Sequence, residues 1–202
     1  MNTAAMGILG SAVDTWATWA VAIGTLGAVG YALFRDLIVT PRRRPSLELA
    51  FDREGHDQLV HSGAAHVRMR VVNRPGKDTA DEVVVVMTTL RRVSEPEETR
   101  PIGLPLTWSG SSPPLTMSSV HPGSERHVDL PRCDRRSGLQ LDLSPKPPTG
   151  ADVLEPGSYE LSVEVRARNA DAIRYVIPVA WDGEEAGEIW DHLRVKGPRQ
   201  LR

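Results

Sequence analysis

Histidines at a regular spacing are the first side chains in this sequence that could bind a metal ion. His56, His61 and His66 recur every five residues. An odd spacing along a β-strand points neighbouring side chains to opposite faces, so histidines in one strand cannot converge on a metal ion. We therefore expect a metal site here only if residues 55–65 form a loop, and we predict none.

Carboxylates and a single thiol are the other candidate reactive groups. Asp182 begins an acidic cluster that ends beside His192, and its spacing is not that of a calcium-binding loop. We interpret this cluster as a solvated surface. Cys133 is the only cysteine, which excludes an internal disulfide and a zinc site built on Cys pairs. Nearby arginines lower a thiol pKa, but we expect Cys133 to be an unreactive loop residue.

Motifs that would indicate catalysis are missing from the sequence. It contains no G-x-S-x-G, Walker A, G-x-G-x-x-G or H-E-x-x-H pattern. We therefore predict no enzyme, no cofactor and no small-molecule ligand. With 24 Lys and Arg against 26 Asp and Glu, the formal net charge of −2 also argues against a globally basic nucleic-acid binder.

Arginines and tryptophans supply the candidate contact surfaces. Arg68 and Arg70, with Arg91 and Arg92, would form a basic stripe if their strands were neighbours. This stripe has no interleaved aromatic residues, so we interpret it as a solvated face and predict no nucleic-acid partner. Among the tryptophans, we expect Trp181 in the core. The predicted partner surface consists of Trp190 and Trp108.

An uncharged segment near the N-terminus predicts a transmembrane helix over residues 15–34. Its 19 residues from Trp16 to Phe34 would extend roughly 28 Å as a helix, close to the thickness of a bilayer core. Trp16, Trp19, Tyr31 and Phe34 would place aromatic rings at both interfaces. Residues 1–14 form a short leading segment. Residues 1–13 contain no Lys or Arg, which argues against a cleaved signal peptide.

Small residues recur every four positions within this predicted span. Ala20, Gly24, Ala28 and Ala32 would share one helix face, and such faces let two helices approach closely. A homo-oligomer formed through the transmembrane helix is therefore one possible assembly.

The basic residues on one side of the span predict its direction. Arg35, Arg42, Arg43 and Arg44 lie in a linker over 35–45 that is punctuated by Pro41 and Pro45 and has a net charge of +3. Because basic residues stay on the cytoplasmic side, we predict an N-terminus outside and a cytoplasmic C-terminal domain. The arginines would also contact lipid headgroups. We expect Pro41 and Pro45 to prevent the helix from continuing into the domain.

After the linker, apolar residues alternate with polar ones at the period of β-strands. The clearest alternating runs are 67–72, 159–165 and 173–181, and the last two should form a hairpin. Residues 82–90 are apolar on both faces, which predicts a strand in the centre of a sheet. About eight strands with Pro-Gly turns predict an all-β, antiparallel immunoglobulin-like sandwich over residues 46–196, followed by a tail at 197–202. Residues 188–195 are either a short helix or an edge strand.

Two Pro-Gly turns that lead into strands carry a resemblance to a known class of protein. The sequences are HPGSERHVDL at 121–130 and LEPGSYELSVEV at 154–165. Both are similar to immunoglobulin-like and fibronectin-type modules, and residues 67–86 resemble the first paired strands of such modules. With its anchor, the chain resembles uncharacterised bacterial single-pass membrane proteins that carry one C-terminal sandwich. This resemblance implies a fold and no activity or binding residue.

The predicted function is that of a membrane-anchored, non-enzymatic binding or scaffold module that presents a cytoplasmic sandwich to a protein partner. Two alternatives remain open. One is a small membrane effector or sensor whose transmembrane helices oligomerise. The other is a cell-surface binding domain, if the topology is reversed.

Overall fold

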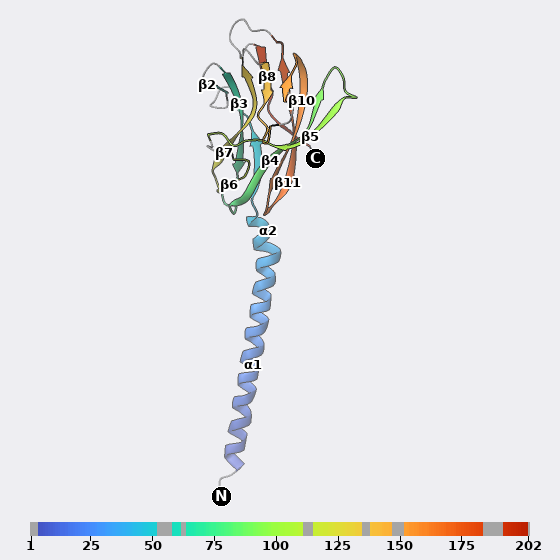
Figure 1. The fold of residues 1–202 in the computed structure, drawn as a ribbon. Helices are drawn as coiled ribbons and strands as arrows, with labels where there is room; N and C mark the ends of the chain where they lie inside the picture. The colour runs from blue at the N-terminus through green and yellow to red at the C-terminus, as the bar shows by residue number, and fades with distance from the viewer. Residues whose placement is uncertain are drawn as a thin grey trace. The chain divides into compact units, whose positions relative to one another are not determined.

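The computed structural model describes residues 4–51, 58–61, 64–110, 115–134, 138–146, 152–183 and 192–201. The chain divides into a helical unit that ends at Arg44 and a β unit that begins at Pro45 (Figure 1). The boundary between the units therefore lies at the C-terminal end of the predicted linker.

The helical unit is longer than the predicted span. It consists of α1 (Ala4–Phe34), the π-helical turn η1 (Arg35–Val39) and α2 (Thr40–Arg43). Within it, Trp16–Val39 is apolar enough to cross a membrane, with a mean hydropathy of 1.5 over its most apolar window. The described residues thus contain one helix that is long and apolar enough to span a bilayer. It continues five residues beyond the predicted end at Phe34.

The helix ends at Arg43, before the β unit, as predicted, but Pro41 itself does not interrupt it. A proline lacks the N–H group that a helix interior needs, but it is tolerated in the first turn of a helix. Pro41 lies in the first turn of α2, directly after the π-helical turn. The Thr40 hydroxyl donates a hydrogen bond to the Arg35 carbonyl oxygen at 2.9 Å, which spans this wider turn.

Two antiparallel sheets form the β unit (Figure 1). The six-stranded sheet has the order β1 (Leu47–Ala50), β3 (Ala64–Asn73), β7 (Glu125–Asp134), β8 (Gly138–Leu141) and β9 (Val153–Leu154), with β2 (Gln58–His61) also paired to β3. The seven-stranded sheet has the order β12 (Leu193–Val195), β11 (Ala170–Trp181), β10 (Gly157–Ala167), β4 (Ala80–Arg92) and β5 (Thr99–Pro105); β13 (Arg199–Gln200) pairs with β11 and β6 (Ser118–Val120) with β4.

Both sheets contribute to one hydrophobic core. Val83, Val85 and Met87 of β4 are buried in it, as alternation at period two predicts. Trp181 is also buried, which confirms its predicted place in the core. The backbone N–H of Leu49 in β1 donates to the Tyr175 hydroxyl of β11 at 3.2 Å and so links the two sheets. Two antiparallel sheets around a shared core agree with the predicted sandwich architecture.

The strongest sequence signals appear where they were predicted. β10 and β11 form the expected hairpin, and β4 lies inside its sheet between β10 and β5. Gly76 has a φ of 73°, the conformation that the predicted Pro75-Gly76 turn requires. Beside this turn, the buried Asn73 amide donates to two carbonyl oxygens and accepts from the Ser46 N–H, which fixes the start of the β unit.

Other details differ from the predictions. The described residues contain thirteen strands rather than about eight, because pieces of two to four residues are too short to show alternation. β3 and β4 belong to different sheets, so the expected first strand pair is wrong. Part of the predicted tail forms β13. Leu193–Val195 is an edge strand, while residues 188–191 lie outside the described part of the chain.

Candidate functional site

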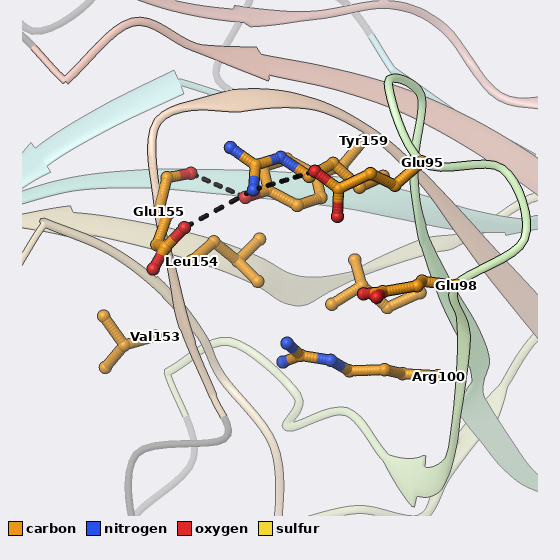
Figure 2. A pocket seen from close by; sticks show the side chains of 9 residues that line it. Glu95, Glu98, Arg100, Val153, Leu154, Glu155 and Tyr159 are labelled. Atoms are coloured by element: carbon orange, nitrogen blue, oxygen red, sulfur yellow. Dashed lines mark hydrogen bonds and ion pairs between the residues drawn. The ribbon is translucent and has the colours of Figure 1, made fainter.

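A pocket of about 270 Å³ lies beside the connection between β4 and β5 (Figure 2). Its rim carries two arginines and three glutamates, which are Arg92, Arg100, Glu95, Glu98 and Glu155. Arg92 donates to the Pro156 carbonyl oxygen at 2.9 Å and pairs with Glu155 and Glu95. The Tyr159 hydroxyl donates to the Glu155 carbonyl oxygen at 2.7 Å, and burial raises the pKa of this tyrosine. These contacts balance the charge of Arg92 within the chain. They also hold the segment between β4 and β5 against the start of β10.

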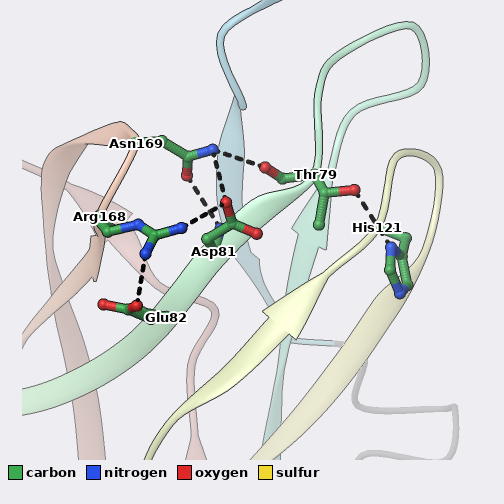
Figure 3. A network of polar contacts seen from close by, with 6 residues as sticks. All are labelled: Thr79, Asp81, Glu82, His121, Arg168 and Asn169. Atoms are coloured by element: carbon green, nitrogen blue, oxygen red, sulfur yellow. Dashed lines mark hydrogen bonds and ion pairs between the residues drawn. The ribbon is translucent and has the colours of Figure 1, made fainter.

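A second polar cluster joins turns at one end of the sandwich (Figure 3). Arg168 pairs with Glu82 at 2.8 Å and with Asp81 at 3.2 Å. The Asn169 amide donates to the Thr79 carbonyl oxygen and accepts from the Asp81 N–H, so it replaces missing backbone partners. Glu82 has a φ of 52° at this point of β4. The cluster therefore connects the β10–β11 turn to the start of β4, and we interpret it as structural.

The outer face of the seven-stranded sheet carries more cations than carboxylates. Among the described residues of β4 and β10–β13, and of the segment between β12 and β13, this face presents six cationic side chains, which are Arg91, Arg166, Arg174, Arg194, Lys196 and Arg199. Two carboxylates, Glu160 and Glu164, lie among these cations. We call this surface the basic face. Its charge contrasts with the net −2 of the whole chain.

Each of the two carboxylates on the basic face bridges two arginines. Glu164 accepts from Arg166 Nε at 2.7 Å and from Arg174 Nε at 3.0 Å, and its side chain is only 8% exposed. The hydrogen bond from Arg166 is the main reason that the pKa of Glu164 is lowered; desolvation opposes this shift. Glu160 pairs with Arg91 and, at 3.2 Å, with Arg199.

A groove of about 640 Å³ crosses this face beside β12, and we call it the basic groove. Short side chains from β10 and β11, including those of Ser158 and Ala180, contribute to its lining. Arg194 and Lys196 also line it, and neither side chain makes a hydrogen bond or ion pair with the described residues. The groove is therefore a concave surface on which two exposed cations make no ion pair with the described residues, an arrangement suited to binding anionic groups.

The structure overturns half of the predicted partner surface. Trp108 is 1% exposed, its backbone bridges to Val128 of β7, and its ring belongs to the core. The aromatic side chain packs between the sheets because burial removes its large apolar surface from water. Trp190 lies outside the described residues, so its predicted role stays a prediction.

The predicted basic stripe does not form. Arg68 and Arg70 lie on β3 in the six-stranded sheet, whereas Arg91 and Arg92 lie on β4 in the other. Only Arg91 joins the basic face. Sequence reasoning missed Arg194, Lys196 and Arg199. Arg194 and Arg199 lie in strands too short for periodicity to assign a face, and Lys196 lies between these strands. Their clustering in the last ten residues of the chain was the available signal.

The candidate metal and thiol residues are placed differently from expectation. Cys133 lies in β7 and is fully buried, so its assignment to a loop is wrong. His61 and His66 lie on the adjacent strands β2 and β3, and His56 is outside the described residues. The Asp182 carboxylate accepts a hydrogen bond from His192 Nδ1 at 3.0 Å, while residues 184–191 are not described. In the described part of the chain, no group of three or more such side chains could hold a metal ion.

The helix residues singled out from the sequence are exposed on the helical unit. Trp16, Trp19, Tyr31 and Phe34 are 53–77% exposed. Ala20, Gly24, Ala28 and Ala32 are also exposed, as a face that meets lipid or another helix would be. Arg35 begins η1, Arg42 and Arg43 end α2, and Arg44 follows.

Comparison of the chain with protein-family models, with curated proteins and with solved structures finds no match.

Proposed function

We propose that this chain is a single-pass membrane protein whose β-sandwich acts as a non-enzymatic module that binds a protein partner through the basic groove. The observation that carries this proposal is the pair of exposed cations in the lining of a concave surface, Arg194 and Lys196, which make no ion pair with the described residues. A helix of sufficient length and hydropathy supports the anchor. Anchoring confines the module to the membrane plane and raises its effective concentration near other membrane proteins.

An immunoglobulin-like arrangement is the finer form of this fold proposal. It is supported by two antiparallel sheets around one core, by the β10–β11 hairpin and by the Pro-Gly turns before β7 and β10. It predicts that the two sheets pack with their strands within about 30° of each other. An experimental structure that shows orthogonal sheets would contradict it.

We further propose that the N-terminus is outside and the β unit is cytoplasmic. The support is the asymmetry between an N-terminal flank without Lys or Arg and a C-terminal flank with Arg42, Arg43 and Arg44. Labelling of intact cells with a membrane-impermeant maleimide tests this. The chosen sites are Ala5→Cys and, separately, Glu97→Cys, which replaces an exposed loop residue.

The buried Cys133 of the otherwise unmodified chain serves as the background control, since it should not react. We expect labelling at position 5 alone in intact cells, and labelling at position 97 after permeabilisation. Labelling at position 97 alone in intact cells would reverse the topology and make cell-surface partners the candidates.

Photo-crosslinking in native membranes tests the binding role itself. A crosslinker at Ala180, in the groove, should give a protein adduct that the same crosslinker at Ala50, on the six-stranded sheet, does not give. A chain that remains a lone monomer with no adduct at Ala180 would contradict the proposed function.

A further inference from the structure

We propose that the basic groove binds an extended acidic peptide segment of the partner, with Arg194 and Lys196 as the receptors for its carboxylates. This inference rests on the proposed function and names the chemistry of the partner. Three features of the groove carry it: the way the basic face already holds carboxylates, the lack of an ion pair between the described residues and either Arg194 or Lys196, and the shape of the lining.

Carboxylates are the anions that this face holds in the folded chain. Glu160 and Glu164 come from alternate outward positions of β10, and each lies between two guanidinium groups. Charge-assisted hydrogen bonds of this kind are stronger than neutral ones. Next along the groove, Arg194 lies opposite Ala180, and Ala180 lies opposite Ser158 of β10. Ser158 therefore occupies the outward position of β10 before Glu160, where a carboxylate would lie in line with Arg194.

The two unbridged cations are consequently open to a carboxylate from another molecule. Arg194 and Lys196 are exposed, and neither has an ion pair with the described residues. Lys196 is held in place through its backbone, whose N–H donates to the Pro178 carbonyl oxygen at 3.0 Å. An acidic ligand would thus meet cations on a fixed backbone without having to displace a partner among the described residues, which avoids one cost of binding.

The lining of the groove favours a peptide over flat or stacked ligands. Ser158, Pro178 and Ala180 have short side chains, so a main chain can approach the sheet closely. A bilayer surface does not enter a concavity of this size, about 640 Å³. Single-stranded nucleic acids bind through exposed aromatic platforms, whereas Tyr159, which contributes to this lining, is only 6% exposed.

The test uses the full chain in nanodiscs of phosphatidylcholine and a fluorescein-labelled peptide of four Glu-Ser repeats. Fluorescence anisotropy should show binding that weakens as NaCl is raised from 50 to 300 mM, because the cations are exposed to solvent. The double variant R194Q/K196Q should weaken binding by about tenfold or more, the scale of one lost charge-assisted hydrogen bond.

A matched variant separates the groove from net charge. R68Q/R100Q removes the same two charges from residues that also lack ion pairs with the described chain, away from the groove. It should change the dissociation constant by less than about twofold. Circular dichroism and thermal unfolding should show that both double variants remain folded, since all four side chains lie at the surface or are only half-buried.

Several outcomes would overturn the inference. These are no binding of the Glu-Ser peptide, equal binding of a Lys-Ser peptide, or an equal loss in R68Q/R100Q. Displacement of the peptide by phosphatidylserine vesicles or by an octanucleotide, dependent on Arg194 and Lys196, would assign the groove to phosphates instead. If the Ala180 crosslink persisted in R194Q/K196Q, the proposed binding role of the groove would be retained. The proposal that Arg194 and Lys196 receive the partner's carboxylates would be wrong.

Discussion

The outer faces of the two sheets distribute charge in different ways. On the six-stranded sheet, Arg70 pairs with Glu125 at 3.5 Å, and Arg74 beside β3 pairs with Glu48 at 3.3 Å. Each of these arginines has its own carboxylate. On the seven-stranded sheet, Glu160 and Glu164 are each shared by two arginines, and Arg194 and Lys196 make no ion pair with the described residues. Arg68 on the six-stranded sheet also has no such ion pair, so the faces differ in how their carboxylates are shared and in the pair of exposed cations that lines the basic groove.

The carboxyls of Asp142 and Glu164, one beside each sheet, also differ. The pKa of Asp142, beside the six-stranded sheet, is raised mainly by burial and further by Asp129. The pKa of Glu164 is lowered, because two arginines bond it directly. For these two carboxyls, the direction of the pKa shift follows direct bonding to guanidinium groups, which lowers the pKa of Glu164, or its lack, which leaves burial to raise the pKa of Asp142.

The two faces lie on opposite sides of a shared core. Trp108→Ala should have the largest effect of the changes considered, because it removes a side chain from that core. Removing a fully buried tryptophan should lower the free energy of unfolding by about 3–5 kcal/mol. Urea denaturation followed by circular dichroism measures this loss. Leu115→Ala, at a residue that is 50% exposed, is the matched control and should cost about 0.5 kcal/mol or less. Equal stability of the two variants would show that Trp108 is not buried in the core.

Trp108 also illustrates what the sequence reveals and what it does not. The β10–β11 hairpin was predictable from two long alternating runs, and the central place of β4 from a run that is apolar on both faces. Trp108 stands beside Ser109 and Gly110 without such a run, so its burial depends on a single bridge to β7. Arg194 and Arg199 lie in strands of three and two residues. Periodicity cannot assign a face to so short a strand. The groove could therefore be identified only from the pairing of β12 and β13 with β11.

Glu164→Gln should have the next largest effect and acts on the basic face. The amide keeps the shape but loses two charge-assisted hydrogen bonds, so we expect a loss of about 1–3 kcal/mol at neutral pH. A carboxyl whose pKa is lowered in the folded state stabilises the protein above its unfolded pKa, and that contribution disappears as the pH falls through the folded value. Thermal melts from pH 7 to pH 3 should therefore converge for wild type and variant.

The matched change on the other face is Glu125→Gln, at a carboxylate that is 47% exposed and pairs with one arginine. It should cost about 0.5 kcal/mol or less. A loss as large as that of Glu164→Gln would show that sharing a carboxylate between two arginines gives no special stability.

Glu160→Gln should sharpen the comparison by making the basic face more basic. It removes the carboxylate that occupies Arg91 and Arg199, and it removes a like charge from the lining of the groove. We expect the Glu-Ser peptide to bind roughly threefold to fivefold more tightly, on the scale of one exposed ion pair. Anisotropy titration measures this change, with Glu125→Gln as the equally charged control. Weaker binding to Glu160→Gln would place the peptide elsewhere.

Asp142→Asn should have the smallest effect and the opposite sign to Glu164→Gln. The Asp142 side chain makes no hydrogen bond or ion pair with the described residues, and burial raises its pKa in the folded chain. Ionised Asp142 therefore destabilises the fold above this pKa, and protonation relieves the cost as the pH falls toward the ordinary value of 3.8. Asn should raise stability by about 0.5 kcal/mol at pH 7. The gain should vanish near pH 3, where thermal melts of both chains should coincide. A loss of stability at pH 7 would mean that the six-stranded face, like the other, holds its carboxyl in the charged form.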